Sequence, residues 1–61
     1  MVTQVEPKSI MAGDTIVVTN EAVTVRYIDG PDRIGTYEFG VIDKSGNSHI
    51  EIVTEPVTLI M

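Results

Sequence analysis

The stretch 36-TYEFGVIDKSGNSHIEIV-53 decides the fold class of this 61-residue chain. Two runs rich in Val, Ile and aromatic residues flank Asp43–Asn47, in which Gly46 stands where a tight turn needs a positive φ. The first run alternates, and the apolar side chains on one of its faces are Tyr37, Phe39 and Val41. The stretch therefore predicts a β-hairpin with strands over Thr36–Ile42 and His49–Val53.

The pairing register of this hairpin has alternatives. A type I turn with a glycine bulge sets Phe39 opposite Glu51. A shift by one residue sets Phe39 opposite Ile50 or Ile52 instead, and these partners bury the phenylalanine better. We expect a β-bulge that produces such a shift, located at Gly40.

Outward from the hairpin, short runs of Val, Ile and Thr alternate with turn residues, and no segment has the apolar spacing of a helix. The longest loop is Asp29–Gly35, because two glycines, a proline and two aspartates exclude a central strand. We predict a single all-β domain over residues 1–61, a small five-stranded barrel. A first segment, Val2–Val5, precedes the expected strands, which are Thr15–Thr19, Ala22–Ile28, Thr36–Ile42, His49–Val53 and Val57–Met61.

Composition excludes several classes of protein. The chain has no cysteine and one histidine, so disulfides and cysteine-zinc sites are excluded, and we expect no metal and no cofactor. Nine acidic against four basic residues give a net charge of −5, which repels phosphate backbones and disfavours direct nucleic-acid binding. No run is long and apolar enough for a membrane span, and no signal peptide opens the chain, so we expect a cytoplasmic protein.

The segment Ile10–Val18, with Gly13 and Asp14 just before its strand, precedes a long loop and a tight hairpin at Asp43–Asn47. In this spacing the chain resembles, over residues 10–61, the small SH3-like barrels of the translation-protein and KOW type. The resemblance implies the fold. Nucleic-acid-binding members of that family carry basic residues around the sheet, and this acidic chain departs from them, so no binding function is carried over.

The sequence predicts no catalytic residue. His49 is the only histidine, and its neighbour Ser48 points to the opposite face of a strand, so a nucleophile–base pair is geometrically poor. We expect His49 on an exposed polar face beside Glu51, away from Ile50 and Ile52. A 61-residue barrel also offers little concave space to enclose a substrate, and we expect a protein that is not an enzyme.

The loop Asp29–Gly35 is the candidate partner-binding surface, because function concentrates on long loops and because Tyr and Arg are enriched at binding hot spots. Its aspartates are better explained as turn-forming residues than as ligands of a hard cation. An alternative for the two tyrosines is that they cap the barrel core with their hydroxyls at its rim. The candidate residues are Tyr27, Asp29, Asp32, Arg33, Ile34 and Tyr37.

The last strand runs to the end of the sequence without a charged residue. It either closes the barrel against the first strand or lies at a subunit interface. Consecutive large apolar residues must point to both faces of a strand, so we predict a homo-oligomer, most simply a dimer, with its interface at this strand. The interface residues are Val57, Leu59, Ile60 and Met61.

These features predict a non-enzymatic protein-interaction module or small subunit, such as a virus- or phage-type accessory protein, that binds a larger protein partner or itself. The alternative is an acidic mimic of nucleic acid that inhibits a DNA- or RNA-binding protein. The acidic residues are spread almost evenly, which makes a thin imitation of phosphate. Salt separates the two, because a mimic loses affinity steeply as salt rises and an apolar contact does not.

Overall fold

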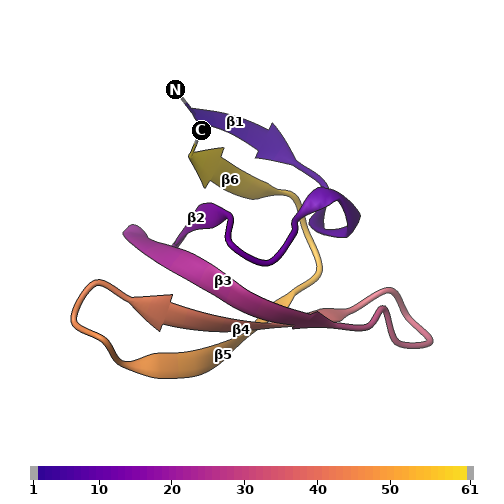
Figure 1. Ribbon diagram of the computed structural model, residues 1–61. Coiled ribbons are helices and arrows are strands. Elements are labelled where there is room, and N and C mark those ends of the chain that lie inside the picture. The colour runs from indigo at the N-terminus through magenta and orange to yellow at the C-terminus, as the bar shows by residue number, and fades with distance from the viewer. Residues whose placement is uncertain (1, 61) are drawn as a thin grey trace.

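The computed structural model describes residues 2–60 and confirms an all-β chain. Its elements are β1 (Val2–Val5), the short 3₁₀ turn η1 (Pro7–Ser9), β2 (Thr15–Val18), β3 (Glu21–Asp29), β4 (Tyr37–Asp43), β5 (Ser48–Val53) and β6 (Val57–Ile60) (Figure 1). The described residues contain no α-helix, as the period-two runs of β-branched and aromatic residues predict.

The strands form one antiparallel sheet in the order β1-β6-β2-β3-β4-β5. The predicted five-stranded barrel is not confirmed, because the sheet has six strands and is not closed. The first segment of the chain is a sixth strand that pairs with β6, and β6 pairs on its other side with β2. Both sides of β6 are thereby occupied, so β1 and β5 remain as the two edges of the sheet.

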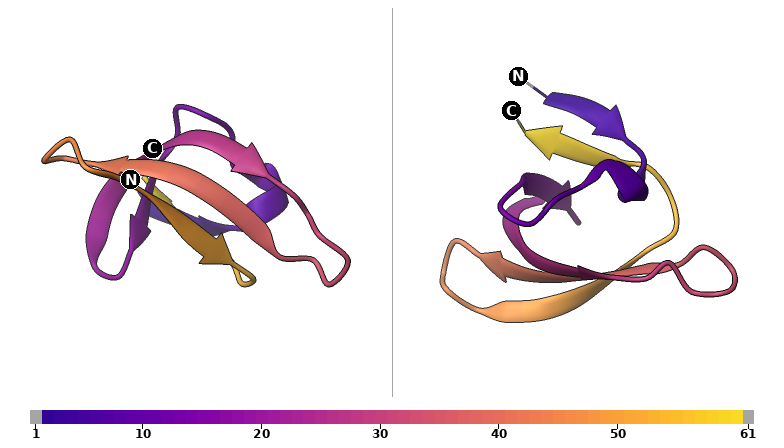
Figure 2. Two further views of the ribbon diagram at one scale, coloured as in Figure 1. Left: turned by 90° about the horizontal axis from the view of Figure 1, so that it is seen from below. Right: turned by 45° about the vertical axis from the view of Figure 1, so that its right-hand side comes forward.

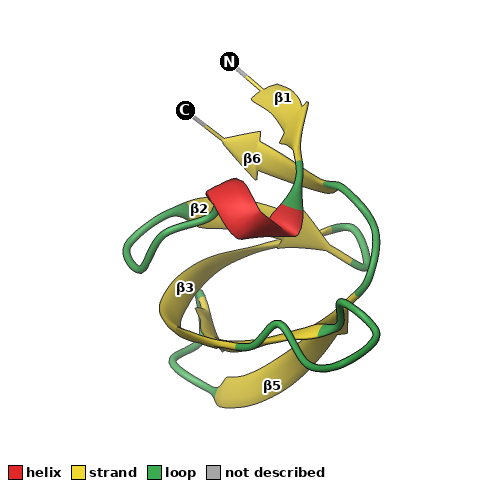
Figure 3. Ribbon diagram, turned by 90° about the vertical axis from the view of Figure 1, so that its right-hand side faces the viewer, coloured by secondary structure: helices red, strands yellow, loops and turns green. Residues whose placement is uncertain are grey.

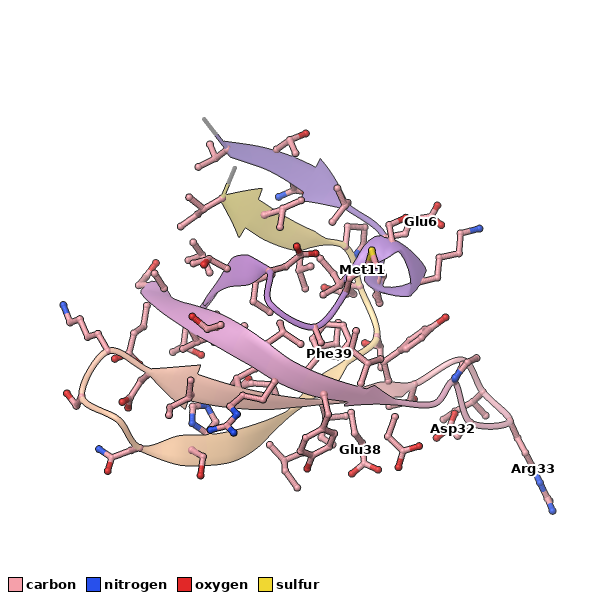
Figure 4. The ribbon with its side chains drawn as sticks, in the orientation of Figure 1. Glu6, Met11, Asp32, Arg33, Glu38 and Phe39 are labelled. Atoms are coloured by element: carbon pink, nitrogen blue, oxygen red, sulfur yellow. The ribbon has the colours of Figure 1, made fainter. Side chains whose placement is uncertain are left out.

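The sheet curls strongly, so that β1, β6 and β2 face β3, β4 and β5 across the core (Figures 2 and 3). Phe39 lies on the inner side of β4 and is fully buried, whereas its neighbour Glu38 points to the outer side (Figure 4). Side chains from both halves complete the core, which consists of Ile10, Ile16, Val23, Val25, Phe39, Val41, Val53 and Val57.

The β4–β5 register differs from the one we expected. Phe39 lies opposite Glu51, and no bulge interrupts this ladder. The register shift is in the neighbouring ladder, where Arg26 of β3 is the extra residue opposite Gly40 and Val41. The expectation failed because Phe39 is covered by the facing half of the sheet and needs no apolar partner on β5.

The hairpin turn at Asp43 fixes this register. The Asp43 N–H donates to the Asn47 carbonyl at 2.9 Å, and the Gly46 N–H donates to the Asp43 carbonyl at 3.0 Å. One carboxylate oxygen of Asp43 accepts the N–H groups of Ser45 and Asn47, each at 2.9 Å. Gly46 has a φ of 90°, which confirms the positive φ predicted for it.

The β3–β4 connection contains a turn of the same construction. The Asp32 N–H donates to the Thr36 carbonyl, and the Gly35 N–H donates to the Asp32 carbonyl. The Asp32 carboxylate accepts the N–H groups of Ile34 and Thr36, each at 2.9 Å, and Gly35 has a φ of 85°. Asp32 is therefore a turn-forming residue, as the sequence indicated. The two turns project from opposite ends of the sheet (Figure 1).

Candidate protein-interaction surface

Strand β5 turns its two isoleucines outward, whereas its last residue, Val53, belongs to the core. Paired residues of antiparallel strands share a face, so His49 and Glu51, opposite Val41 and Phe39, lie on the inner side of the sheet. The outer side of β5 carries Ser48, Ile50 and Ile52, and the two isoleucines are 53% and 61% exposed.

The structure confirms that His49 is exposed, beside Glu51 and on the face opposite to Ile50 and Ile52. That face is nevertheless the inner one and not an outer polar face. The ring lies on the core side of the sheet, near its open edge, where Nε2 is 2.7 Å from Oε2 of Glu51. Both side chains remain partly exposed there, because none of the strands within residues 2–60 pairs with the outer edge of β5. Ser48 points to the other face, so the two residues do not form a nucleophile–base pair.

Tyr27 of β3 lies on the same outer side as the two isoleucines. It is paired with Gly40 of β4, and its ring covers this glycine so closely that a Cβ at position 40 would overlap the ring. The ring is 51% exposed. An aromatic side chain laid over a cross-strand glycine shields a backbone that has no side chain of its own. We call the surface formed by Tyr27, Gly40, Ile50 and Ile52 the convex face.

This packing predicts an NMR signature. We expect the Gly40 Hα resonances to be shifted upfield by the ring current of Tyr27, and the shift to disappear in Tyr27→Leu. In Gly40→Ala the half-exposed ring must swing into solvent, which changes the Tyr27 resonances and leaves those of the buried Val25 nearly unchanged. Ordinary Gly40 Hα shifts in the wild-type protein would contradict this placement of the ring.

The two ends of the convex face differ in charge. At one end, Arg26, Tyr27, Gly40, Ser48 and Ile50 line an open hollow, and Lys44 lies in the adjacent β4–β5 turn. At the other end, a second hollow is lined by Ile52 together with acidic residues, which are Asp29, Asp32 and Glu38. The acidic side chains that line a hollow therefore gather at the Ile52 end of the face, whereas each end has one basic residue in its adjacent turn, Lys44 or Arg33.

Strand β5 also presents unpaired backbone groups. The Asp43 N–H donates to the Asn47 carbonyl, so these two residues form a hydrogen-bonded pair at the start of the ladder. Hydrogen-bonded and non-hydrogen-bonded pairs alternate along antiparallel strands, so the backbone N–H and C=O groups of His49 and Glu51 point toward β4. The N–H and C=O groups of the intervening residues point away from the sheet, toward its free edge. These residues are Ser48, Ile50 and Ile52, the ones whose side chains lie on the outer side.

The predicted partner-binding loop is not assembled into one surface. Tyr27 lies on the convex face, whereas Tyr37 lies on the inner side, with its ring centroid 6.3 Å from that of Phe39. Arg33 and Ile34 occupy the tip of the turn, where Ile34 is 85% exposed and Arg33 projects from the body (Figure 4). The remaining two are Asp29, at the end of β3 among the residues of the acidic hollow, and Asp32, whose carboxylate closes the turn.

The predicted interface strand is internal to the sheet. Val57 belongs to the core, Leu59 packs against the core, and Ile60 is half-buried opposite Val2. Met61 lies outside the described residues. With both edges of β6 paired in its own chain, self-association through backbone pairing of this strand has no free edge to use. A homo-oligomer remains a prediction.

Within residues 2–60, no three His, Asp or Glu side chains are grouped as metal ligands. No helix in this part of the chain has the length and apolarity needed to cross a bilayer. Comparisons with protein-family models, with curated proteins and with solved structures found no match.

Proposed function

We propose that the chain is a non-enzymatic protein-interaction module or small subunit that binds another protein through its convex face. The observation that carries the proposal is the outward direction of Ile50 and Ile52 beside Tyr27. Single exposed apolar residues are ordinary, but adjacent ones on a sheet face next to an open edge are typical of contact surfaces.

Energetics favour a contact at this place. Covering a large apolar side chain contributes about 1.5–3 kcal/mol when burial is complete, and roughly half of that area is still exposed on Ile50 and Ile52. Tyrosine is among the residues most enriched at binding hot spots. The free backbone groups of β5 add hydrogen bonds that an incoming strand can satisfy.

The partner class, the biological role and the location expected from the sequence are part of the same proposal. The net charge of −5 disfavours a phosphate backbone as the ligand, and the proposed partner is a protein. A virus- or phage-type accessory role and a cytoplasmic location belong to this proposal. The resemblance of Ile10–Val18 to SH3-like barrels also belongs to this proposal. It concerns the fold and implies no activity.

The test is affinity capture from the source cell with three tagged proteins, each verified as folded by circular dichroism. We expect wild type and Ile34→Asp to retain the same partner and Ile52→Asp to lose it, because only Ile52 lies on the convex face. Loss with Ile34→Asp and retention with Ile52→Asp would instead place the contact at the turn tip and refute the proposal.

The acidic hollow around Ile52 supports the alternative function, an acidic mimic of nucleic acid. The salt dependence of partner binding distinguishes the two functions. A contact made by Tyr27 and the isoleucines changes little between low and high salt. Partner release that rises steeply with ionic strength would favour the mimic over the apolar contact.

A further inference from the structure

We infer that the occupant of the β5 edge is a second copy of this chain, paired antiparallel with β5 about a two-fold axis at Ile50. This inference rests on the proposed function and names the partner. The pairing of the two β5 strands joins the two sheets into one continuous sheet and makes the convex faces of both copies adjacent.

The edge of β5 is suited to pairing. The strand has six residues, Ser48–Val53, and it contains no proline, no lysine and no glycine. Its ladder with β4 is regular, without a bulge to twist the edge away from a partner. Proline, lysine and bulges are devices that protect edge strands, and the one protective device in β5 is the charge of Glu51 on its inner side, which a two-fold axis at Ile50 pairs with His49 of the second copy. The free N–H and C=O groups of Ser48, Ile50 and Ile52 are placed to bond a neighbouring strand.

The order of residues in β5 selects the register. About Ile50, the strand reads Ser-His-Ile-Glu-Ile, so a two-fold axis at this residue sets His49 opposite Glu51 of the second copy, and Glu51 opposite its His49. An axis at Glu51 would place two carboxylates directly opposite each other, which destabilises a sheet. An axis at His49 forms neither His–Glu pair and shortens the overlap of the strands. Only the axis at Ile50 forms both pairs.

The same operation places Lys44 of one copy on the side of Glu38 of the other. Antiparallel pairing places the β4–β5 turn of one copy, which contains Lys44, beside the end of β5 of the other copy where Ile52 is paired with Glu38. No comparable charge pattern exists on the other edge, because β1 reads Val-Thr-Gln-Val.

Cross-linking tests the register directly, since the chain has no cysteine of its own. We expect Ile50→Cys to form a covalent dimer with a short bis-methanethiosulfonate reagent, because the two positions meet at the axis about 5.5 Å apart between Cα atoms. Ser48→Cys alone should not, because its two copies lie roughly 14 Å apart, four residues along the strand. A mixture of Ser48→Cys and Ile52→Cys should cross-link, and Ile34→Cys serves as the control for random collision.

Sedimentation tests the assembly. The wild-type protein should dimerise at micromolar concentration, and Ile50→Lys should raise the dissociation constant by about tenfold or more, because it sets two like charges across the axis. Ile50 is half-exposed, so circular dichroism should show that the variant stays folded.

Three results would overturn the inference: a wild-type monomer at all concentrations, a ring larger than a dimer, or cross-linking by Ser48→Cys and not by Ile50→Cys. If one of these occurs while Ile52→Asp still loses a captured protein, the pairing of two copies is refuted and the proposed function stands. If Ile52→Asp loses nothing and Ile50→Cys cross-links, the convex face serves self-association alone.

Discussion

Phe39→Ala leaves most of the protein unfolded at 25 °C. Phe39 is the largest of the fully buried side chains, and it bridges the two facing halves of the curled sheet. Truncating a buried phenylalanine costs about 3–5 kcal/mol, through lost burial and the cavity that remains. A domain of this size without disulfides has on the order of 3–5 kcal/mol in total, so the loss removes nearly all of the stability.

Urea titration followed by circular dichroism measures this effect, and Ile52→Ala is the matched control. Ile52 lies on a strand adjacent to that of Phe39 but on the outer side, where it is 61% exposed. Its truncation should cost less than about 1 kcal/mol, the range of ordinary surface substitutions. Equal losses in the two variants would show that the outer side of β5 is covered in the monomer and would contradict the face assignment.

The fold class and the placement of Phe39 were predictable because both depend on local alternation. The run from Tyr37 to Val41 puts Phe39 and Val41 on one face whatever strand lies beside it, and both are buried. The turn at Asp43–Asn47 was predictable for the same reason, since its chemistry lies within five consecutive residues.

The face of β5 was wrongly chosen between two alternatives, because Ile50 and Ile52 resemble core residues in type and the register given by the turn was set aside. A shift of one residue in the register sends every side chain of a strand to the other face. The apolar alternation favoured burying the isoleucines, whereas the turn bonds of Asp43 impose the register that exposes them. Local turn geometry therefore prevails over burial at this strand.

Local sequence patterns also could not predict whether the sheet closes into a barrel. A barrel of five strands requires β6 to be the last member, but Val2–Val5 adds to its free side and the sheet stays open. One signal of the candidate surface was present in the sequence. A glycine inside a strand, Gly40, marks a place where another group approaches the backbone, and that group is the ring of Tyr27.

The similarity of the two turns could also be predicted from the sequence. Asp32-Arg33-Ile34-Gly35-Thr36 and Asp43-Lys44-Ser45-Gly46-Asn47 share aspartate first, a basic residue second and glycine fourth. In both, the aspartate carboxylate bonds two N–H groups and the glycine has a positive φ. These turns hold the two ends of β4, which carries Phe39 in the core and Gly40 under the convex face.

The double variant Gly35→Val/Gly46→Val is expected to lose about 2–6 kcal/mol of stability, the sum of about 1–3 kcal/mol for each β-branched residue forced to a positive φ. Neither site is crowded, since an added Cβ meets no atom within 4 Å, so the cost is backbone strain alone. The turns lie at opposite ends of β4, and the two losses should add. Urea titration of both single variants and the double variant measures this. Asparagine at the same positions is the control, because it tolerates this conformation at a smaller cost. Valine no worse than asparagine would refute the strain argument.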